Sequence, residues 1–177
     1  MRPAAGHWTA FASALLVLGT TACSDDADVS RAIGVLVRER QVETVVLSDA
    51  TRFAWDEVYL FKPYTPRSRV CSTLGIRTAD CVRTIAFESR DDGEMSFAFL
   101  HRGRLVRYLR HGRGNGDFTP VPTRQPLSPA TAVFRVVTED ADGRTWFRLV
   151  LAAPVRGVHP AGDAAVRPRT AADKPPA

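Results

Sequence analysis

The feature that most constrains the fold is the stretch over residues 53–66, F-A-W-D-E-V-Y-L-F-K-P-Y-T-P. It holds five aromatic residues in fourteen positions, in a chain that is 8% aromatic. Because successive side chains of a strand point to opposite faces, a strand over 53–61 would place on one face Phe53, Trp55, Glu57, Tyr59 and Phe61. The opposite face would carry Ala54, Asp56, Val58 and Leu60. Apolar groups on both faces indicate a central strand, covered by a helix on one side and by loops or a second layer on the other.

The end of this stretch predicts that the strand stops and a helix follows. Pro63 cannot donate a hydrogen bond to a sheet, so it ends the strand. Thr65 and Pro66 are typical of a helix start, a capping hydroxyl followed by proline at the first helical position. The helix is expected to run to about Leu74 and to stop at Gly75, which suits the left-handed position after a helix.

Residues 1–22 have the features of an export signal. Arg2 supplies a positive charge, and residues 8–18 form an apolar run of eleven residues. A membrane-spanning helix needs about 20 apolar residues, so this run has the length of a secretory signal core instead. Removal of the signal takes away Arg2, and the net charge falls from +5 to +4.

Cys23 lies at the predicted cleavage site. Residues 20–23, T-T-A-C, resemble the lipobox of bacterial lipoproteins, although Thr20 stands where leucine is usual. The same small residues also satisfy an ordinary signal-peptidase site. Lipidation of Cys23 is favoured because it leaves Cys71 and Cys81 as an even pair in an oxidising compartment.

A lipidated Cys23 would anchor the chain to the periplasmic face of the cell envelope. Residues 23–30 are then a polar tether. Ser24, by resemblance to the enterobacterial sorting rule, favours the outer membrane over the inner one.

Cys71 and Cys81 are predicted to form a structural disulfide. The bond would close a loop of about 11 residues and stabilise the fold by roughly 2.5–3 kcal/mol on the chain-entropy model. A redox-active pair would more often show the Cys-x-x-Cys spacing, which this pair lacks.

The remaining elements predict one α+β domain over residues 31–153. Ser30 is expected to cap a short amphipathic helix over 31–41. Strands are predicted, with the aromatic stretch, over 42–47, 53–61, 83–89, about 95–99, 105–110, 132–138 and 145–151. Residues 112–130 are expected to form a surface loop, and residues 154–177 a disordered tail. The expected fold is an antiparallel sheet of six or seven strands with two short helices.

The sequence lacks the common enzyme signatures G-x-S-x-G, H-E-x-x-H and the Gly-rich phosphate loop. His101 and His111 could face each other across a hairpin, but exposed turn residues are the simpler interpretation. Asp56 and Glu57 fall on opposite faces of the strand and so cannot form an acid/base pair. A buried Asp56 would need an arginine or backbone amides as a partner. We therefore predict no catalytic residue, no metal ligand and no cofactor.

The run over residues 101–113 contains five arginines. Arg104, Arg107 and Tyr108 could present an anion-binding surface there. The alternative is a solvated face in a chain whose basic residues are almost all arginine. In an exported lipoprotein we expect no nucleic-acid partner, and acidic glycans or lipid head groups are the expected polyanions.

The pattern F-x-W-D-x-V-Y-x-F-x-P-Y-T, from Phe53 to Thr65, resembles a motif of small uncharacterised bacterial exported proteins, many of them lipoproteins. The resemblance implies a short N-terminal helix, this strand and an antiparallel continuation. It implies no activity. The motif is interpreted as a nucleating strand with a rigid exit at Pro63, with the alternative that Trp55 or Tyr64 lines a partner groove.

These observations favour a non-enzymatic envelope lipoprotein that binds a protein or another envelope component. The alternative is a periplasmic inhibitor or immunity-type lipoprotein that blocks a hostile enzyme. A mature charge of +4 argues against an inhibitor of cationic lysozymes, because binding partners favour complementary charge.

Overall fold

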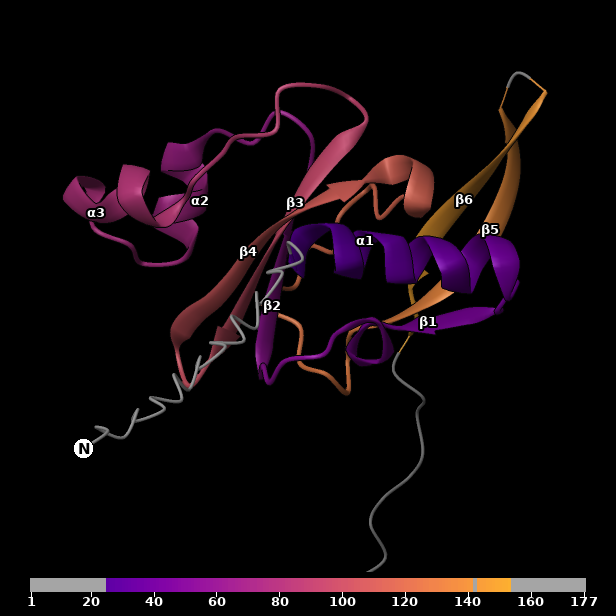
Figure 1. The fold of residues 1–177 in the computed structure, drawn as a ribbon, viewed down its shortest axis with the longest axis horizontal. Helices are drawn as coiled ribbons and strands as arrows, with labels where there is room; N and C mark the ends of the chain where they lie inside the picture. Colours follow the sequence, from indigo (N-terminus) through magenta and orange to yellow (C-terminus); the bar gives the residue numbers. More distant parts are fainter. Residues whose placement is uncertain (1–24, 142, 154–177) are drawn as a thin grey trace, which may run out of the picture.

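The computed structural model describes residues 25–141 and 143–153. In this part of the chain, two antiparallel three-stranded sheets combine with three α-helices into an α+β fold (Figure 1). The helical elements are α1 (Asp25–Gly34), the π-helical turn η1 (Val35–Glu39), the 3-10 turn η2 (Leu47–Ala50), α2 (Arg67–Thr73), α3 (Thr78–Thr84) and the 3-10 turn η3 (Arg113–Asn115). The strands are β1 (Thr44–Val46), β2 (Glu57–Phe61), β3 (Glu94–His101), β4 (Arg104–Gly112), β5 (Val133–Ala141) and β6 (Arg144–Leu151). The predicted signal peptide, Cys23 and the predicted tail lie outside the described residues.

The strands are divided between two sheets. The central sheet has the order β2-β3-β4, and the arm sheet has the order β1-β5-β6. The prediction of a single sheet is therefore wrong, although the strands 95–99, 105–110 and 145–151 are each found with longer bounds. The strand predicted over 132–138 is found as β5, one residue later at its start and three residues longer at its end, and the strand predicted over 42–47 is found as the shorter β1. The link between β4 and β5 carries Phe118 into the core, where its ring meets Phe97 of the central sheet and Phe134 of the arm sheet edge-on.

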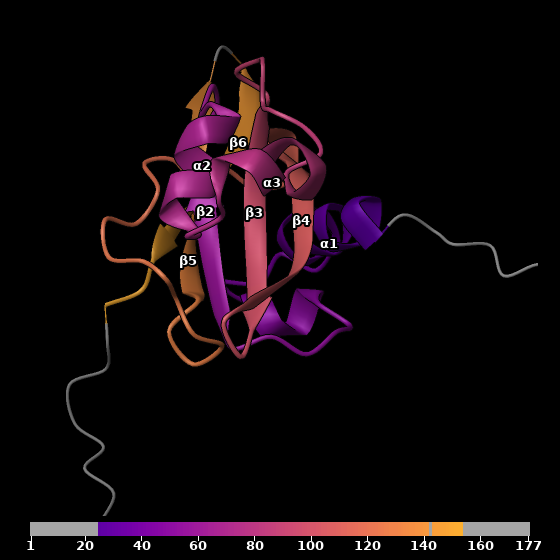
Figure 2. The ribbon, with the colours of Figure 1, turned by 90° about the vertical axis from the view of Figure 1, so that its left-hand side faces the viewer.

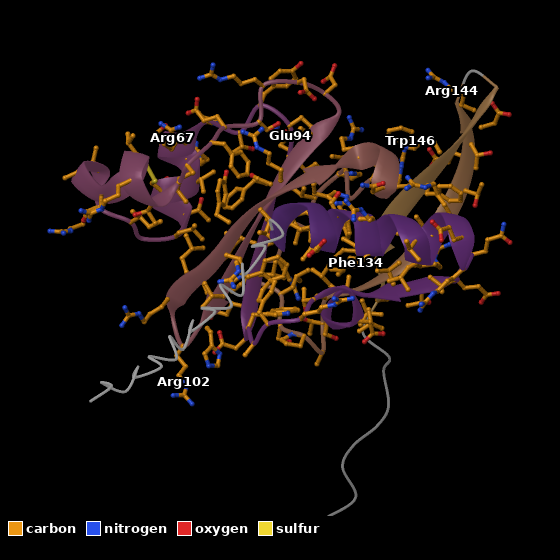
Figure 3. All side chains as sticks on the ribbon, in the orientation of Figure 1. Arg67, Glu94, Arg102, Phe134, Arg144 and Trp146 are labelled. Atoms are coloured by element: carbon orange, nitrogen blue, oxygen red, sulfur yellow. A yellow bond between two sulfur atoms is a disulfide. The ribbon has the colours of Figure 1, made fainter. Side chains whose placement is uncertain are left out.

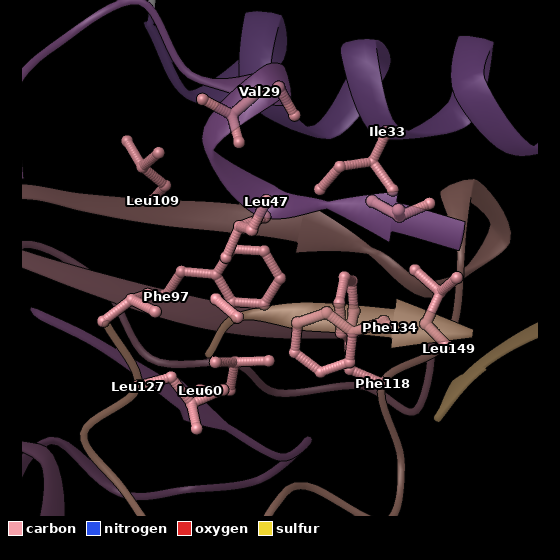
Figure 4. Close-up of a cluster of buried hydrophobic side chains, with 14 of the residues drawn as sticks. Val29, Ile33, Leu47, Leu60, Phe97, Leu109, Phe118, Leu127, Phe134 and Leu149 are labelled. Atoms are coloured by element: carbon pink, nitrogen blue, oxygen red, sulfur yellow. The ribbon is translucent and has the colours of Figure 1, made fainter. Parts of the chain in front are cut away.

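The main core lies between α1, the central sheet and the arm sheet. Its centre is a set of three fully buried rings, with centroids 5.2 Å apart for Phe97 and Phe118 and 4.7 Å apart for Phe118 and Phe134. Figure 4 shows Val29 and Ile33 of α1 above these rings. Full burial of each such side chain contributes about 1.5–3 kcal/mol, so this cluster holds α1 against both sheets.

A second, smaller core covers the opposite face of the central sheet, where α2 and α3 pack (Figure 2). The predicted disulfide between Cys71 and Cys81 joins these two helices. Both cysteines are buried beside Val70 and Ile85. The bond thus stabilises the smaller of the two cores.

The aromatic stretch differs from its prediction, because only residues 57–61 pair as a strand. Phe53 and Trp55 precede β2 and pack in the main core against Phe99. Tyr59 and Phe61 face the second core instead, so the expected single aromatic face is split between the two sides of the sheet. The alternation of side chains between two faces holds only within β2, and Phe53 and Trp55 precede that strand.

β2 is also an edge strand of the central sheet rather than a central one. Its outer edge is nevertheless covered by the β4–β5 link. The Gln125 amide bonds both the amide and the carbonyl of Leu60, and Leu127 pairs with Val58 through two backbone hydrogen bonds. This cover explains why β2 is apolar on both faces and does not expose an unpaired edge.

Three predicted local structures need correction. α1 begins at Asp25, inside the segment predicted as a tether, so Ser30 lies within the helix and is not its cap. Thr65 does not cap α2; its hydroxyl donates to the Lys62 carbonyl in the preceding turn. The predicted strand at 83–89 is absent, because the helix α3 runs to Thr84 and an irregular segment follows. Gly75 has the predicted left-handed backbone, with φ of 66°.

Candidate functional site

Trp55, a predicted binding residue, is part of the core. Its side chain is 8% exposed, and its indole N–H donates to the Thr51 hydroxyl at 2.9 Å. The ring lies edge-on to Phe99 at 5.3 Å. The geometry therefore gives Trp55 a structural role and leaves it no groove to line.

Tyr108 is also occupied by internal contacts. Its hydroxyl donates to Ser96 Oγ at 3.0 Å, and its ring stacks on Phe87 at 4.5 Å. Burial raises the pKa of Tyr108. The guanidinium of Arg110 lies over the Phe87 ring, 4.0 Å from its centre. Phe87 and Arg110 thus cover the Tyr108 ring on this face of the hairpin.

The other predicted binding residues are exposed but lie far apart. Tyr64 follows β2 and is 58% exposed, whereas Arg104 pairs with His101 at the opposite end of the central sheet. Figure 3 shows Arg102 at the tip of the same β3–β4 hairpin, away from Arg67 of α2. Arg107 lies near neither Tyr64 nor Arg104. Its guanidinium is 5.3 Å from the ring centre of Phe53. The structure does not bring the predicted set together into one surface.

The two histidines do not face each other. His101 lies at the hairpin tip with Nδ1 3.4 Å from Asp56 Oδ2, while His111 pairs with Met95 at the far end of β4. Asp56 is half-exposed and accepts a hydrogen bond from the Arg102 amide at 2.7 Å, so a backbone amide is its partner. Among the residues whose side chains the structure describes, no group of three or more His, Cys, Asp or Glu could hold a metal ion.

A polar node that the sequence did not predict is built around Asp117. Its carboxylate, 1% exposed, accepts two hydrogen bonds from Arg113 at 3.0 and 2.7 Å and one from the Trp146 indole at 3.1 Å. Thr119 adds bonds from both its amide and its hydroxyl. Burial alone would raise the pKa of Asp117, but these donors outweigh it and lower the pKa to about 2.

The node ties the β4–β5 link to the arm sheet. The backbone of Asp117 bonds the carbonyl of Phe147 and the amide of Leu149. Gly116, just before it, has φ of 133°, and an added Cβ would lie 2.7 Å from a methyl group of Leu149. Only glycine fits there. The R-x-x-x-D spacing of Arg113 and Asp117 was a signal for this pair, but Trp146 could not be placed from sequence.

His111 lies beside the node and is also buried. Its Nε2 is 2.7 Å from the Gly116 carbonyl, and its ring stacks on Phe97 at 4.8 Å. Burial lowers the pKa of His111 to about 4, so the ring is neutral at ordinary pH. Both strongly shifted groups thus belong to the packed interior.

One exposed feature of the described chain with the geometry of a binding site is a cleft of about 370 Å³. We call it the α1 cleft: it lies between α1, the π-helical turn and residues 49–53. Its apolar lining consists of Val29, Ala32, Val35, Leu36, Ala50 and Phe53. Its charged lining consists of Asp28, Arg31, Arg40, Asp49 and Arg52.

The π-helical turn forms one wall of this cleft. The Arg40 amide bonds the Val35 carbonyl at 2.9 Å, a five-residue step, and the Val42 amide bonds the Leu36 carbonyl. The wider turn places Val35, Leu36 and Arg40 on the cleft side. Single π-helical turns inside helices occur often at functional sites.

A second, more open groove of about 680 Å³ lies between the end of the π-helical turn and the arm sheet. Val136 and Phe147 form part of its lining. Arg38 at its rim is engaged within the fold, because its guanidinium donates to the Gly114 carbonyl at 2.6 Å. Val37, Val136 and Phe147 line this groove and also belong to the main core or pack against it, so the groove lies at the edge of that core.

Comparisons with known proteins give no match. No known protein-family model, no curated protein and no solved structure matches it. Within the described part of the chain, no helix is both long enough and apolar enough to cross a membrane. The predicted family of exported lipoproteins therefore stays a prediction.

Proposed function

We propose that this chain is an exported protein, anchored by lipid at Cys23 to the periplasmic face of the envelope, that binds another envelope component and catalyses no reaction. The export signal and the T-T-A-C sequence at residues 20–23 support the anchoring. Ser24 favours the outer membrane. The observation that carries the binding role is the α1 cleft.

The α1 cleft supports binding because it combines an apolar floor with charges that the fold does not use. Arg31, Arg40 and Arg52 form no ion pair with any carboxylate whose side chain the structure describes. Ligand sites typically join an apolar surface to a few polar groups in a cleft of about 300–1,000 Å³. The α1 cleft falls within that range.

The positions of the strongly shifted groups support a non-enzymatic role. Catalytic acids and bases commonly combine a shifted pKa with a place in a cleft. Here the pKa shifts of His111 and Asp117 arise from burial and internal hydrogen bonds in the node, and neither residue lines the α1 cleft.

A photocrosslinking amino acid at position 49 tests the binding role in intact cells. Asp49 is exposed and lines the α1 cleft, whereas Val82, 69% exposed on α3, is the matched control on the opposite face of the central sheet. We expect a specific adduct from position 49 that is absent from position 82. Capture of an exported hydrolytic enzyme would favour the inhibitor alternative, and no adduct at position 49 would contradict the proposal.

The anchoring is tested separately with a palmitate analogue. We expect label on the wild-type chain and none on the Cys23→Ala variant. Equal labelling of the two would contradict lipidation at Cys23.

A further inference from the structure

We infer that the α1 cleft binds a single-chain amphiphile with an acidic head group, with the aliphatic chain on its floor and the acid among its arginines. This inference rests on the proposed binding function and names the class of ligand. It follows from the floor, the rim and the place of the cleft in the chain.

The floor of the cleft is apolar and held open by the fold. Val29 is 4% exposed and belongs to the main core, while Ala32, Leu36 and Phe53 are only partly buried against it. The Phe53 ring is fixed between Phe99, edge-on at 5.2 Å, and the Arg107 guanidinium at 5.3 Å. α1 lies over the η2 turn that supplies the other side of the cleft (Figure 1). A fixed apolar floor that stays partly exposed favours an apolar occupant.

The rim favours an acid as the head group. Arg31, Arg40 and Arg52 are exposed and form no ion pair with any carboxylate whose side chain the structure describes, although Asp28 and Asp49 line the same cleft. Guanidinium groups match carboxylates and phosphates through paired hydrogen bonds.

The balance of charge on the rim also favours an acid over the alternatives. Three arginines against two aspartates give the lining one net positive charge, which favours an anionic head group over a cationic one. An uncharged amphiphile would offer no charged acceptor to the three guanidinium groups. A polyanion such as a glycan has no apolar chain to place on the floor.

The position of the cleft in the chain also fits an amphiphile. α1, which forms one wall, begins at Asp25, two residues after the predicted lipid-bearing Cys23. An anchor there would hold the cleft close to a membrane surface, where single-chain acidic lipids are found.

Titration of the purified full chain with octanoate and with octyl phosphate tests the inference. Octanol and octyltrimethylammonium have the same chain length and serve as uncharged and cationic controls. We expect the acidic probes to bind, octanol to bind at least about tenfold more weakly because it lacks charge-assisted hydrogen bonds, and the cation not to bind. Preference for octanoate or for octyl phosphate would identify the head group. Equal binding of octanol and the acids would overturn the inference.

Variants locate the site. Arg52→Gln, and separately Arg40→Gln, should each weaken octanoate binding by about tenfold, since each removes a charged donor. Arg69→Gln on α2, across the central sheet, is the matched control and should leave binding unchanged. Circular dichroism confirms that each variant is folded. Octanoate binding that is the same in Arg40→Gln, Arg52→Gln and Arg69→Gln would overturn the inference.

The two proposals fail in different ways. If position 49 captures an envelope protein but neither acidic probe binds, the ligand class is wrong and the binding function stands. If neither position 49 nor the probes give a signal, both proposals are wrong.

Discussion

The Asp117 node and the α1 cleft use the same side chain, arginine, in opposite ways. At the node, Arg113 is about one-fifth exposed and its two bonds to Asp117 are joined by Thr119 and Trp146. At the cleft, Arg31, Arg40 and Arg52 are exposed beside carboxylates that they do not pair with. A paired, partly buried arginine stabilises the fold, whereas an exposed, unpaired one can be removed without loss of stability and remains free to bind a ligand.

The largest expected effect is on the node. Asp117→Asn leaves the Arg113 guanidinium without its charged partner, and we expect a loss of about 4 kcal/mol in the free energy of unfolding. Asp49→Asn, the same substitution at the cleft, should change stability by less than about 0.5 kcal/mol. Urea denaturation measures both. Equal losses of stability in Asp117→Asn and Asp49→Asn would show that the node does not stabilise the fold more than the cleft does.

The second effect is pH-dependent and arises from His111. Because burial lowers its folded-state pKa from 6.5 to about 4, the unfolded chain binds the proton more tightly. The stability is therefore complete above pH 6.5 and falls as the pH drops towards 4, by about 3 kcal/mol in total. Asp117, with its pKa lowered from 3.8 to about 2, loses its own contribution only below that window.

His111→Phe separates the two titrations. The variant keeps an aromatic ring against Phe97 but cannot take up a proton, so the slope of stability between pH 6.5 and 4 should disappear. Urea denaturation at pH 7, 5.5 and 4 measures this slope. A slope that persists in the variant would show that another group controls it.

The third effect is on the second core. Replacement of Cys71 and Cys81 by alanine should cost about 2.5 kcal/mol, since the disulfide closes a short loop. Amide exchange should then increase in α2 and α3 and change little in α1, because the main core lies across the central sheet. Uniform loss of protection in all helices would contradict the division into two cores.

Much of the fold could be predicted where local pattern decides it. The strands β3 to β6 follow from alternation and from turn sequences such as Arg102-Gly103, and the disulfide follows from the count of cysteines. The sequence does not predict α3, because the alternation over 83–89 favours a strand that begins at Arg83, inside the last turn of the helix. The sequence predicts that the aromatic side chains of residues 53–61 share one face, because it shows no break in the alternation at Asp56. In the structure the strand β2 begins only after this residue.

The candidate site could not be predicted, for a physical reason. The α1 cleft brings together residues 28–40 and 49–53, and its walls are set by how α1 packs on the main core rather than by any motif. The aromatic stretch did contain one of its members, Phe53. Its most distinctive residue, Trp55, is structural.

Thermal unfolding of Arg52→Gln and Arg113→Gln, each with and without octanoate, tests whether the cleft arginines bind a ligand while the node arginine stabilises the fold. A ligand that binds only the folded chain raises its melting temperature. We predict that Arg52→Gln melts like the wild type without ligand and loses the rise with octanoate. Arg113→Gln should melt several degrees lower and keep the rise. If Arg52→Gln melts as low as Arg113→Gln, or keeps the full rise with octanoate, Arg52 is not a ligand-binding residue that the fold can spare.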